Sequence, residues 1–165
     1  MIRAATPDDV PTIVQLIGEL AEYEKLAHEV VIEPQALHEH LFGAKPVAEV
    51  LIAEQAGQPV GFALFFTNYS TFVGKPGLWL EDLFVRPNAR GHGHGKALFL
   101  AVSQLAVDRN YGRMEWSVLD WNEPSIRFYQ SMGAIAMDEW TNYRLTPTAL
   151  RSLVAQQQPG PSPQS

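Results

Sequence analysis

Residues 80–96 read LEDLFVRPNARGHGHGK and join an apolar strand to an apolar helix through a short, basic, glycine-rich loop. Glycines at 91, 93 and 95 allow positive φ angles and close approach of a ligand, so successive backbone N–H groups can point at one anion. A helix from about residue 93 to residue 107 adds the N–H groups and the positive dipole end of its first turn. Because Arg90 and Lys96 flank the loop, the stretch predicts a pyrophosphate site.

Two better-known phosphate loops do not fit these residues. A dinucleotide G-x-G-x-x-G pattern fails because Lys96 or Leu98 stands where the third glycine belongs. A P-loop fails because Ala97 follows Gly95-Lys96 in place of serine or threonine, and Arg90 holds the upstream glycine position. Taken alone, the loop is also compatible with a plain glycine turn that caps a helix.

A second segment, VLDWNEPSIRFYQSMG at residues 118–133, indicates the end of a strand followed by a short helix. Pro124 stands near the first helical position and Gly133 at the stop. Asn122, Ser125 and Tyr129 can share one helix face, because Asn122 and Tyr129 lie two helical turns apart. For Tyr129 by itself, packing on a core would be the simpler interpretation.

Together, the pattern Arg90-x-x-Gly93-x-Gly95 and the later Asn122-x-x-Ser125-x-x-x-Tyr129 resemble the GCN5-related N-acetyltransferase (GNAT) superfamily. The resemblance implies a single-domain α/β (α+β) fold, with a mixed, mostly antiparallel sheet and helices on both faces. It implies acetyl-CoA as cofactor. The cofactor-binding residues that it implies are Leu83, Phe84, Val85, Arg90, Gly91, His92, Gly93, His94, Gly95, Lys96, Asn122, Ser125 and Tyr129.

Four further segments resemble the spermidine/spermine (diamine) acetyltransferase subfamily: LAEYEK at 20–25, YSTFVGK at 69–75, LED at 80–82 and LDWNEPS at 119–125. The YSTF and LDWN versions are closer to the thialysine branch. The resemblance runs from about Ile2 to Leu150. It implies a small cationic amine as acceptor, and a homodimer.

The chemistry requires that an alkyl ammonium lose a proton before its nitrogen can attack a thioester. By resemblance, Glu81 is the water-mediated base and Tyr129 gives a proton to the leaving thiolate. The candidate substrate-binding residues are Tyr23, Glu24, Glu81, Asp82 and Phe72. Phe72 could line the aliphatic chain of an amine, and the alternative for it is a core or dimer contact. The alternative for Glu81 and Asp82 is a solvated strand end or a structural salt bridge. The alternative for Tyr23 and Glu24 is a core tyrosine beside a surface acid.

Composition favours one compact domain over residues 1–155, since 165 residues with 46% hydrophobic content can bury a core. Zero cysteines exclude disulfides, a thiol nucleophile and thiolate zinc sites. We expect no metal, because His92 and His94 have no carboxylate or thiolate ligands near them in sequence. A net charge of −6 argues against nucleic acid and favours a cationic substrate.

No charged start precedes an apolar signal region and no apolar run approaches a membrane span, so we expect a cytoplasmic protein without a membrane partner. Residues 156–165 lack apolar side chains and are predicted to be a disordered tail. The periodicity predicts strands at 2–5, 48–54, 59–68, 78–86, 113–119, 135–138 and 141–145. It predicts helices at about 10–21, 34–42, 93–107 and 122–133.

Two other functions remain compatible with these residues. One is a protein lysine or N-terminal acetyltransferase, and the other is an acyl-CoA-binding module without turnover. The joint presence of Glu81, Asn122 and Tyr129 favours an enzyme, because a pure binder would not need Glu81 at the substrate end.

Overall fold

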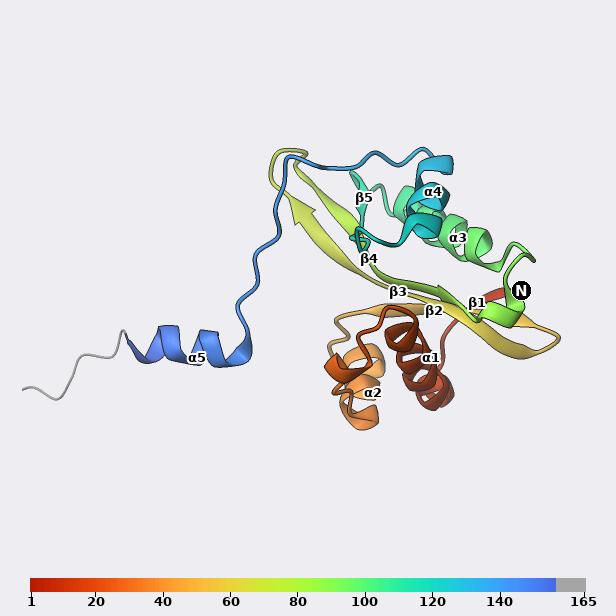
Figure 1. Cartoon of the computed structure of the whole chain (residues 1–165), viewed down its shortest axis with the longest axis horizontal. Helices are drawn as coiled ribbons and strands as arrows, with labels where there is room; N and C mark the ends of the chain where they lie inside the picture. The colour runs from red at the N-terminus through yellow and green to blue at the C-terminus, as the bar shows by residue number, and fades with distance from the viewer. Residues whose placement is uncertain (157–165) are drawn as a thin grey trace, which may run out of the picture. The chain divides into compact units, whose positions relative to one another are not determined.

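Figure 1 shows a computed structural model of the chain, which describes residues 1–156. Contacts within the chain divide it into two compact units. The first unit is Met1–Trp121, and the second begins at Asn122. All but the first residue of the predicted tail, 156–165, lies outside the described residues. The elements of the first unit are β1 (Ile2–Ala4), η1 (Pro7–Asp9), α1 (Val10–Tyr23), η2 (Ala27–Glu29), α2 (Pro34–Phe42), β2 (Glu49–Gln55), β3 (Gln58–Ser70), β4 (Lys75–Val85), η3 (Pro87–Ala89), α3 (His94–Asp108) and β5 (Met114–Glu115).

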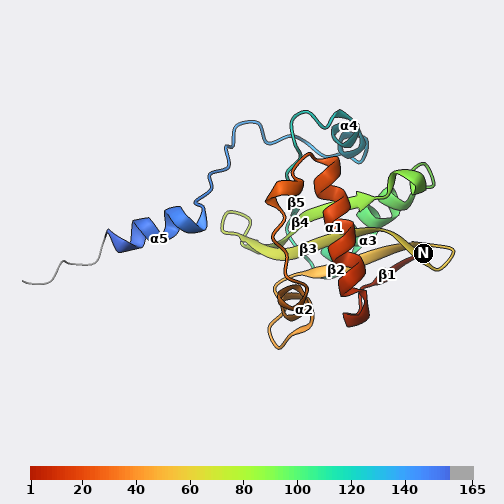
Figure 2. The same cartoon turned by 60° about the horizontal axis from the view of Figure 1, so that its bottom comes forward.

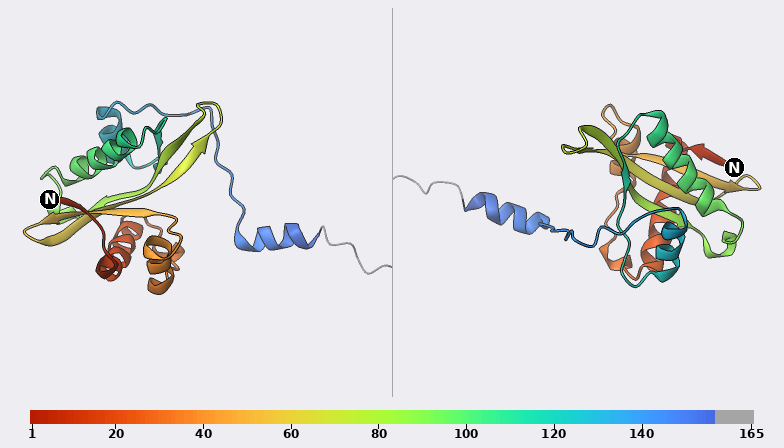
Figure 3. Two further views of the ribbon diagram at one scale, coloured as in Figure 1. Left: turned by 180° about the vertical axis from the view of Figure 1, so that it is seen from behind. Right: turned by 90° about the horizontal axis from the view of Figure 1, so that it is seen from above.

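The first unit is built on one five-stranded sheet in the order β1-β2-β3-β4-β5. The first four strands are antiparallel to their neighbours, and β5 runs parallel to β4. Helices α1 and α2 cover one face and α3 covers the other, as Figures 1 and 3 show. The expected mixed, mostly antiparallel sheet with helices on both faces is therefore confirmed.

A hydrophobic core lies between α1 and the sheet. The helix contributes apolar residues at helical spacing, and the strands contribute alternate residues. Apolar residues of α1 recur every three or four positions, so they form one stripe along the helix. Helix α1 itself lies across the sheet (Figure 2). The buried members of this core are Ile13, Leu16, Leu20, Leu41, Val50, Ile52, Phe62 and Phe84. Burial of one such side chain contributes about 1.5–3 kcal/mol.

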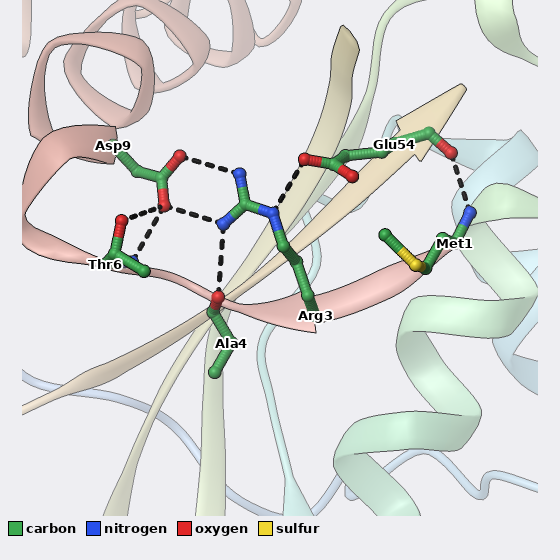
Figure 4. Close-up of polar contacts among 6 residues, drawn as sticks. All are labelled: Met1, Arg3, Ala4, Thr6, Asp9 and Glu54. Atoms are coloured by element: carbon green, nitrogen blue, oxygen red, sulfur yellow. Dashed lines mark hydrogen bonds and ion pairs between the residues drawn. The ribbon is translucent and has the colours of Figure 1, made fainter. Parts of the chain in front are cut away.

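The N-terminus of the chain is tied to the sheet by Arg3 (Figure 4). The two terminal nitrogens of Arg3 donate to the carboxylate of Asp9 at 2.7 and 2.8 Å, and its Nε donates to Glu54 at 2.6 Å. The same Asp9 carboxylate accepts the backbone N–H of Thr6 at 2.7 Å. The hydrogen bond from Arg3 is the main cause that lowers the pKa of Asp9 to about 2, against an ordinary value of 3.8.

We expect Asp9→Asn to lower the free energy of unfolding by about 1–3 kcal/mol at pH 7, because the amide keeps the shape but removes the charged acceptor. The pKa of Asp9 is lower in the folded state, so its contribution is present above about pH 4 and is lost as pH falls through about 2. Urea denaturation of both forms across this range measures the effect. Asp8→Asn, at an exposed neighbouring position, should change stability by less than about 0.5 kcal/mol. Equal losses in the two variants would contradict the assignment.

Strand β4 contains a bulge at Glu81. On β3, consecutive residues Leu64 and Phe65 pair with Asp82 and Leu80, so Glu81 is the extra residue. The alternation of side chains therefore changes at this point. Beyond the bulge, Asp82 shares the α1 face with Phe84, whose side chain belongs to the α1 core. Before it, Leu80 lies on the α3 face, which leaves Glu81 on the α1 face beside Asp82.

The second unit contains α4 (Glu123–Ser131) and α5 (Pro147–Ala155). The strands predicted at 135–138 and 141–145 are wrong, since residues 134–146 form no strand in the structure. Alternating apolar side chains produced that prediction, but a strand also needs a partner, and these residues pair with none of the described strands. Large side chains there are exposed, among them Ile135 at 83% and Tyr143 at 95%. Strand β5 is likewise shorter than the predicted 113–119.

Helix α5 was not predicted, although Thr146 and Pro147 give it an ordinary start. The Thr146 hydroxyl accepts the backbone N–H of Ala149, and Pro147 occupies the first helical position. Among residues 1–156, no helix has the length and apolar character needed to cross a membrane.

Candidate active site

The glycine-rich loop has the backbone geometry that an anion cradle needs. Gly91 and Gly93 have φ angles of 82° and 81°, and Gly93 is the N-cap of α3. A Cβ added at either glycine would meet nothing within 4 Å, so the space in front of both is open. The first N–H groups of α3, at His94, Gly95 and Lys96, have no acceptor within the helix. The residues present therefore fit a phosphate group.

The C-terminal half of β4 has an unpaired edge among the described residues. Strand β5 pairs with β4 only at Leu78 and Trp79, so no strand covers that edge of residues 80–85. The side chain of Phe84 is buried in the α1 core and that of Val85 is buried too. If Leu83, Phe84 and Val85 take part in cofactor binding, Phe84 and Val85 do so through their backbone. The edge offers the N–H and C=O groups for this.

Arg90 does not extend along the loop in this structure. Its Nε donates to the carbonyl of Val85 at 2.9 Å, and its guanidinium lies 4.7 Å from the ring centre of Tyr23. It lies 5.8 Å from the ring centre of Phe84. The cation of the loop therefore borders the end of α1, a contact that the sequence did not predict. Lys96 is exposed.

The two histidines of the loop make separate contacts. His92 Nδ1 lies 3.0 Å from the carbonyl oxygen of Arg90, and His94 Nε2 lies 3.1 Å from the side-chain oxygen of Gln55. No group of three or more metal-ligating side chains occurs in residues 1–156. Both histidines remain beside the cradle, where the sequence predicts them to border a phosphate.

Three carboxylates come together on the α1 face of β4. The bulge places Glu81 and Asp82 on this face, and Glu24 follows the last turn of α1. Burial, and then the charges of Glu81 and Glu24, raise the pKa of Asp82 to about 7. Burial also raises the pKa of Glu24. None of the three forms an ion pair with a described lysine, arginine or histidine.

Aromatic rings border these carboxylates. The indole N–H of Trp79 donates to Glu81 at 2.8 Å, and the Trp79 ring packs against Phe66 with centres 6.5 Å apart. Tyr23 contacts Trp121 at 6.2 Å between ring centres. Phe72, a predicted substrate residue, lies in the β3–β4 turn and is 95% exposed.

A surface cavity of about 400 Å³ opens where β3 extends past the start of β2. Sequence reasoning missed it, since it is formed by a loop and a strand that are far apart in the chain. Phe66 belongs both to its lining and to the ring pair with Trp79. The full lining is Pro46, Val47, Ala48, Glu49, Phe66 and Thr67.

The second unit carries the remaining predicted site residues on or beside α4. The side-chain oxygen of Asn122 accepts the backbone N–H of Ser125 at 3.4 Å, which makes Asn122 the N-cap of α4. Tyr129 lies on α4 with its ring edge against Phe128, at 5.4 Å between centres. The predicted helix and its start are thus confirmed, whereas the roles of Asn122, Ser125 and Tyr129 stay predictions.

The sequence profile of the Acetyltransferase (GNAT) family matches residues 16–134. The chain is similar to the thialysine N-epsilon-acetyltransferase of Bos taurus, with 37% identity over 93% of this chain and 96% of that protein. It is 34% identical to the L-ornithine N5-acetyltransferase of Arabidopsis thaliana, over 92% of this chain and 86% of that protein. Among solved structures, an integron cassette protein from the mobile metagenome of V. cholerae superposes with a TM-score of 0.77. It is 25% identical, over 93% of this chain and 96% of that one.

Proposed function

Because the chain belongs to the acetyltransferase (GNAT) family, we propose that it transfers the acetyl group of acetyl-CoA to the primary amine of a small cationic acceptor. It is an acyltransferase of the type that acts on small amines. The similar proteins act on thialysine and ornithine, which supports an amino acid with a terminal amine, or a diamine or polyamine, as the acceptor. The main support for this proposal is the group of three carboxylates on Glu24, Glu81 and Asp82, none of which forms an ion pair with a described cation.

Acetyltransferases of this family use acetyl-CoA as acetyl donor. The open cradle of Gly91 and Gly93, with the start of α3, supports pyrophosphate binding. Arg90, His92, His94, Gly95 and Lys96 would surround the phosphates. The unpaired edge of β4 at Leu83–Val85 would hold the chain of the cofactor, and we extend the site to Asn122, Ser125 and Tyr129 of α4.

The acceptor would lie against the carboxylates, with Tyr23, Glu24, Glu81 and Asp82 around its cationic groups and Phe72 at the mouth. Acetyl-CoA supplies the acetyl group as a thioester, which the amine attacks directly in a ternary complex. One carboxylate of the pair Glu81 and Asp82 takes the proton of the ammonium group, and Tyr129 gives a proton to the departing sulfur.

We also propose that the protein is a homodimer. Residues 135–145 carry an alternating apolar pattern that is typical of a strand, yet they pair with none of the described strands. Their large apolar side chains are exposed in the single chain. A segment that pairs with a second copy of the chain would show the same exposure when that copy is absent. The residues concerned are Ile135, Met137, Trp140, Tyr143 and Leu145.

A panel of amines with acetyl-CoA, followed by release of free thiol, tests the function. We expect turnover with thialysine, ornithine and polyamines, and none with analogues whose terminal amine is a hydroxyl. The Michaelis constant of a dication should rise with salt, because screening weakens its attraction to the carboxylates. A salt-independent constant, or equal activity on the alcohols, would contradict a cation-selecting amine site. Activity confined to peptides would instead identify a protein acetyltransferase.

A further inference from the structure

We propose that Asp82, and not Glu81, is the carboxylate that takes the proton from the ammonium group of the acceptor. This inference rests on the proposed amine acetyltransferase function. It gives Asp82 the role that family resemblance suggests for Glu81, and it follows from the different surroundings of these two adjacent side chains.

Glu81 is already engaged by the protein. Its carboxylate accepts the indole N–H of Trp79 at 2.8 Å, and its side chain is exposed at the bulge. This carboxylate therefore already has a hydrogen-bond partner within the protein.

Asp82 is partly buried, and its carboxylate accepts no hydrogen bond from residues 1–156. None of the buried side-chain oxygens among these residues lacks a partner, so the Asp82 oxygens must reach the surface of the site. Leu64 lies opposite it on β3, and Phe84 follows it on the same face of β4. A carboxylate that is desolvated, unpaired and open at one end is arranged to meet a cation from outside.

The charged groups around Asp82 raise its pKa, as burial does. Glu81 on β4 and Glu24 at the end of α1 are both negative, and both raise its pKa after the larger effect of burial. Two cations near the end of α1 contact aromatic rings. The guanidinium of Arg90 lies over Tyr23, and Lys25 Nζ lies 5.0 Å from the ring centre of Trp121. A base with a pKa of about 7 is well matched to proton transfer at neutral pH.

The step balances as follows. An N–H bond of the ammonium breaks and its proton passes to a carboxylate oxygen of Asp82. The freed lone pair forms the C–N bond while the C–S bond of the thioester breaks. The second proton on nitrogen leaves to solvent, and the sulfur receives a proton from Tyr129 or water. Asp82 then returns its proton to solvent, and solvent reprotonates Tyr129 where it was the donor. In this scheme Glu81 is a positioning residue, because its charge increases the proton affinity of Asp82.

The test compares the pH dependence of kcat in Asp82→Asn, Glu81→Gln and Glu24→Gln with the wild type. In the wild type, kcat should fall as pH drops below about 7, when Asp82 becomes protonated. Asp82→Asn should lower kcat by about 10²- to 10⁴-fold and abolish this limb. Glu81→Gln and Glu24→Gln should keep the limb and move it to lower pH, because each removes a charge that raises the pKa of Asp82. An alkyl amine has an ordinary pKa of about 10, so the limb that its own ionisation produces lies well above the limb of Asp82.

The opposite pattern would overturn the proposal: a limb abolished by Glu81→Gln and only displaced by Asp82→Asn. Folding is checked by acetyl-CoA affinity, which should be unchanged in all variants. Thermal unfolding at pH 8 should show Asp82→Asn to be more stable than wild type, since the amide avoids burial of a charge; a loss of stability would indicate a structural role.

Carbon-13 NMR titration of the Asp82 carboxyl provides a readout without turnover, and an ordinary titration midpoint near pH 4 would contradict the proposal. If no amine is acetylated by the wild type while Asp82 titrates near 7, the proposed function fails and the ionisation stands.

Discussion

Gly93→Val should raise the dissociation constant of acetyl-CoA by about 10- to 100-fold or more. Gly93 has a φ angle of 81°, which a β-branched residue adopts only at a cost of about 1–3 kcal/mol. The residue is also the N-cap of α3, so relaxation of this strain would turn the first N–H groups of the helix away from one another. A side chain there would in addition occupy the open space in front of the loop. Isothermal titration calorimetry measures the change.

The matched control is Gly74→Val in the β3–β4 turn. Gly74 has a φ angle of 68°, and a Cβ added there meets nothing within 4 Å, as at Gly93. Both variants should therefore lose comparable folding stability, whereas only Gly93→Val should lose affinity for the cofactor. Unchanged affinity in Gly93→Val, or the same loss of affinity in both, would contradict the assignment of the loop.

Tyr129→Phe should lower kcat by about 10²- to 10⁴-fold and leave acetyl-CoA affinity unchanged. The substitution keeps the ring and its packing against Phe128, and it removes only the hydroxyl that we propose as proton donor to sulfur. A thiolate has a lower proton affinity than a phenolate, with ordinary pKa values of about 8.5 and 10, so water can share this task. In that case the loss will be smaller and will deepen as pH rises.

Parallel measurement of kcat and acetyl-CoA affinity across pH separates the possible roles. Tyr69→Phe, at an exposed position of β3, serves as control and should match the wild type. Equal kcat in Tyr129→Phe at every pH would remove the hydroxyl from the mechanism. Loss of affinity with kcat intact would make Tyr129 a binding residue only.

The sequence predicted the elements of the first unit best where local chemistry determines them. Helix α2 spans Pro34–Phe42 as predicted, because proline at the first position fixes its start. Helix α3 begins within one residue of its predicted start because the glycines before it must take positive φ. The strands predicted at 135–138 and 141–145 failed because alternation describes faces of a strand, while formation of a strand depends on a distant partner.

The same distinction between local and long-range determinants applies to the candidate site. The backbone geometry of the glycine loop could be predicted from consecutive residues, since glycine conformation and a helix start are local properties. The separate surroundings of Glu81 and Asp82 could not, because the bulge exists only through the pairing of Leu64 and Phe65 with residues 82 and 80. The placement of Arg90 over Tyr23 joins residues that are distant in the chain, and no sequence pattern indicates it.

The bulge at Glu81 also determines what sequence drift this strand can accept. Loss of one residue between Leu80 and Phe84 would remove the bulge, and the regular pairing that results would keep Phe84 on its present face. Loss of a second residue would turn the large Phe84 ring toward the α3 layer and out of its core. In descendants of this chain, this stretch can therefore shorten by one residue and keep its core, whereas a second deletion would disrupt it.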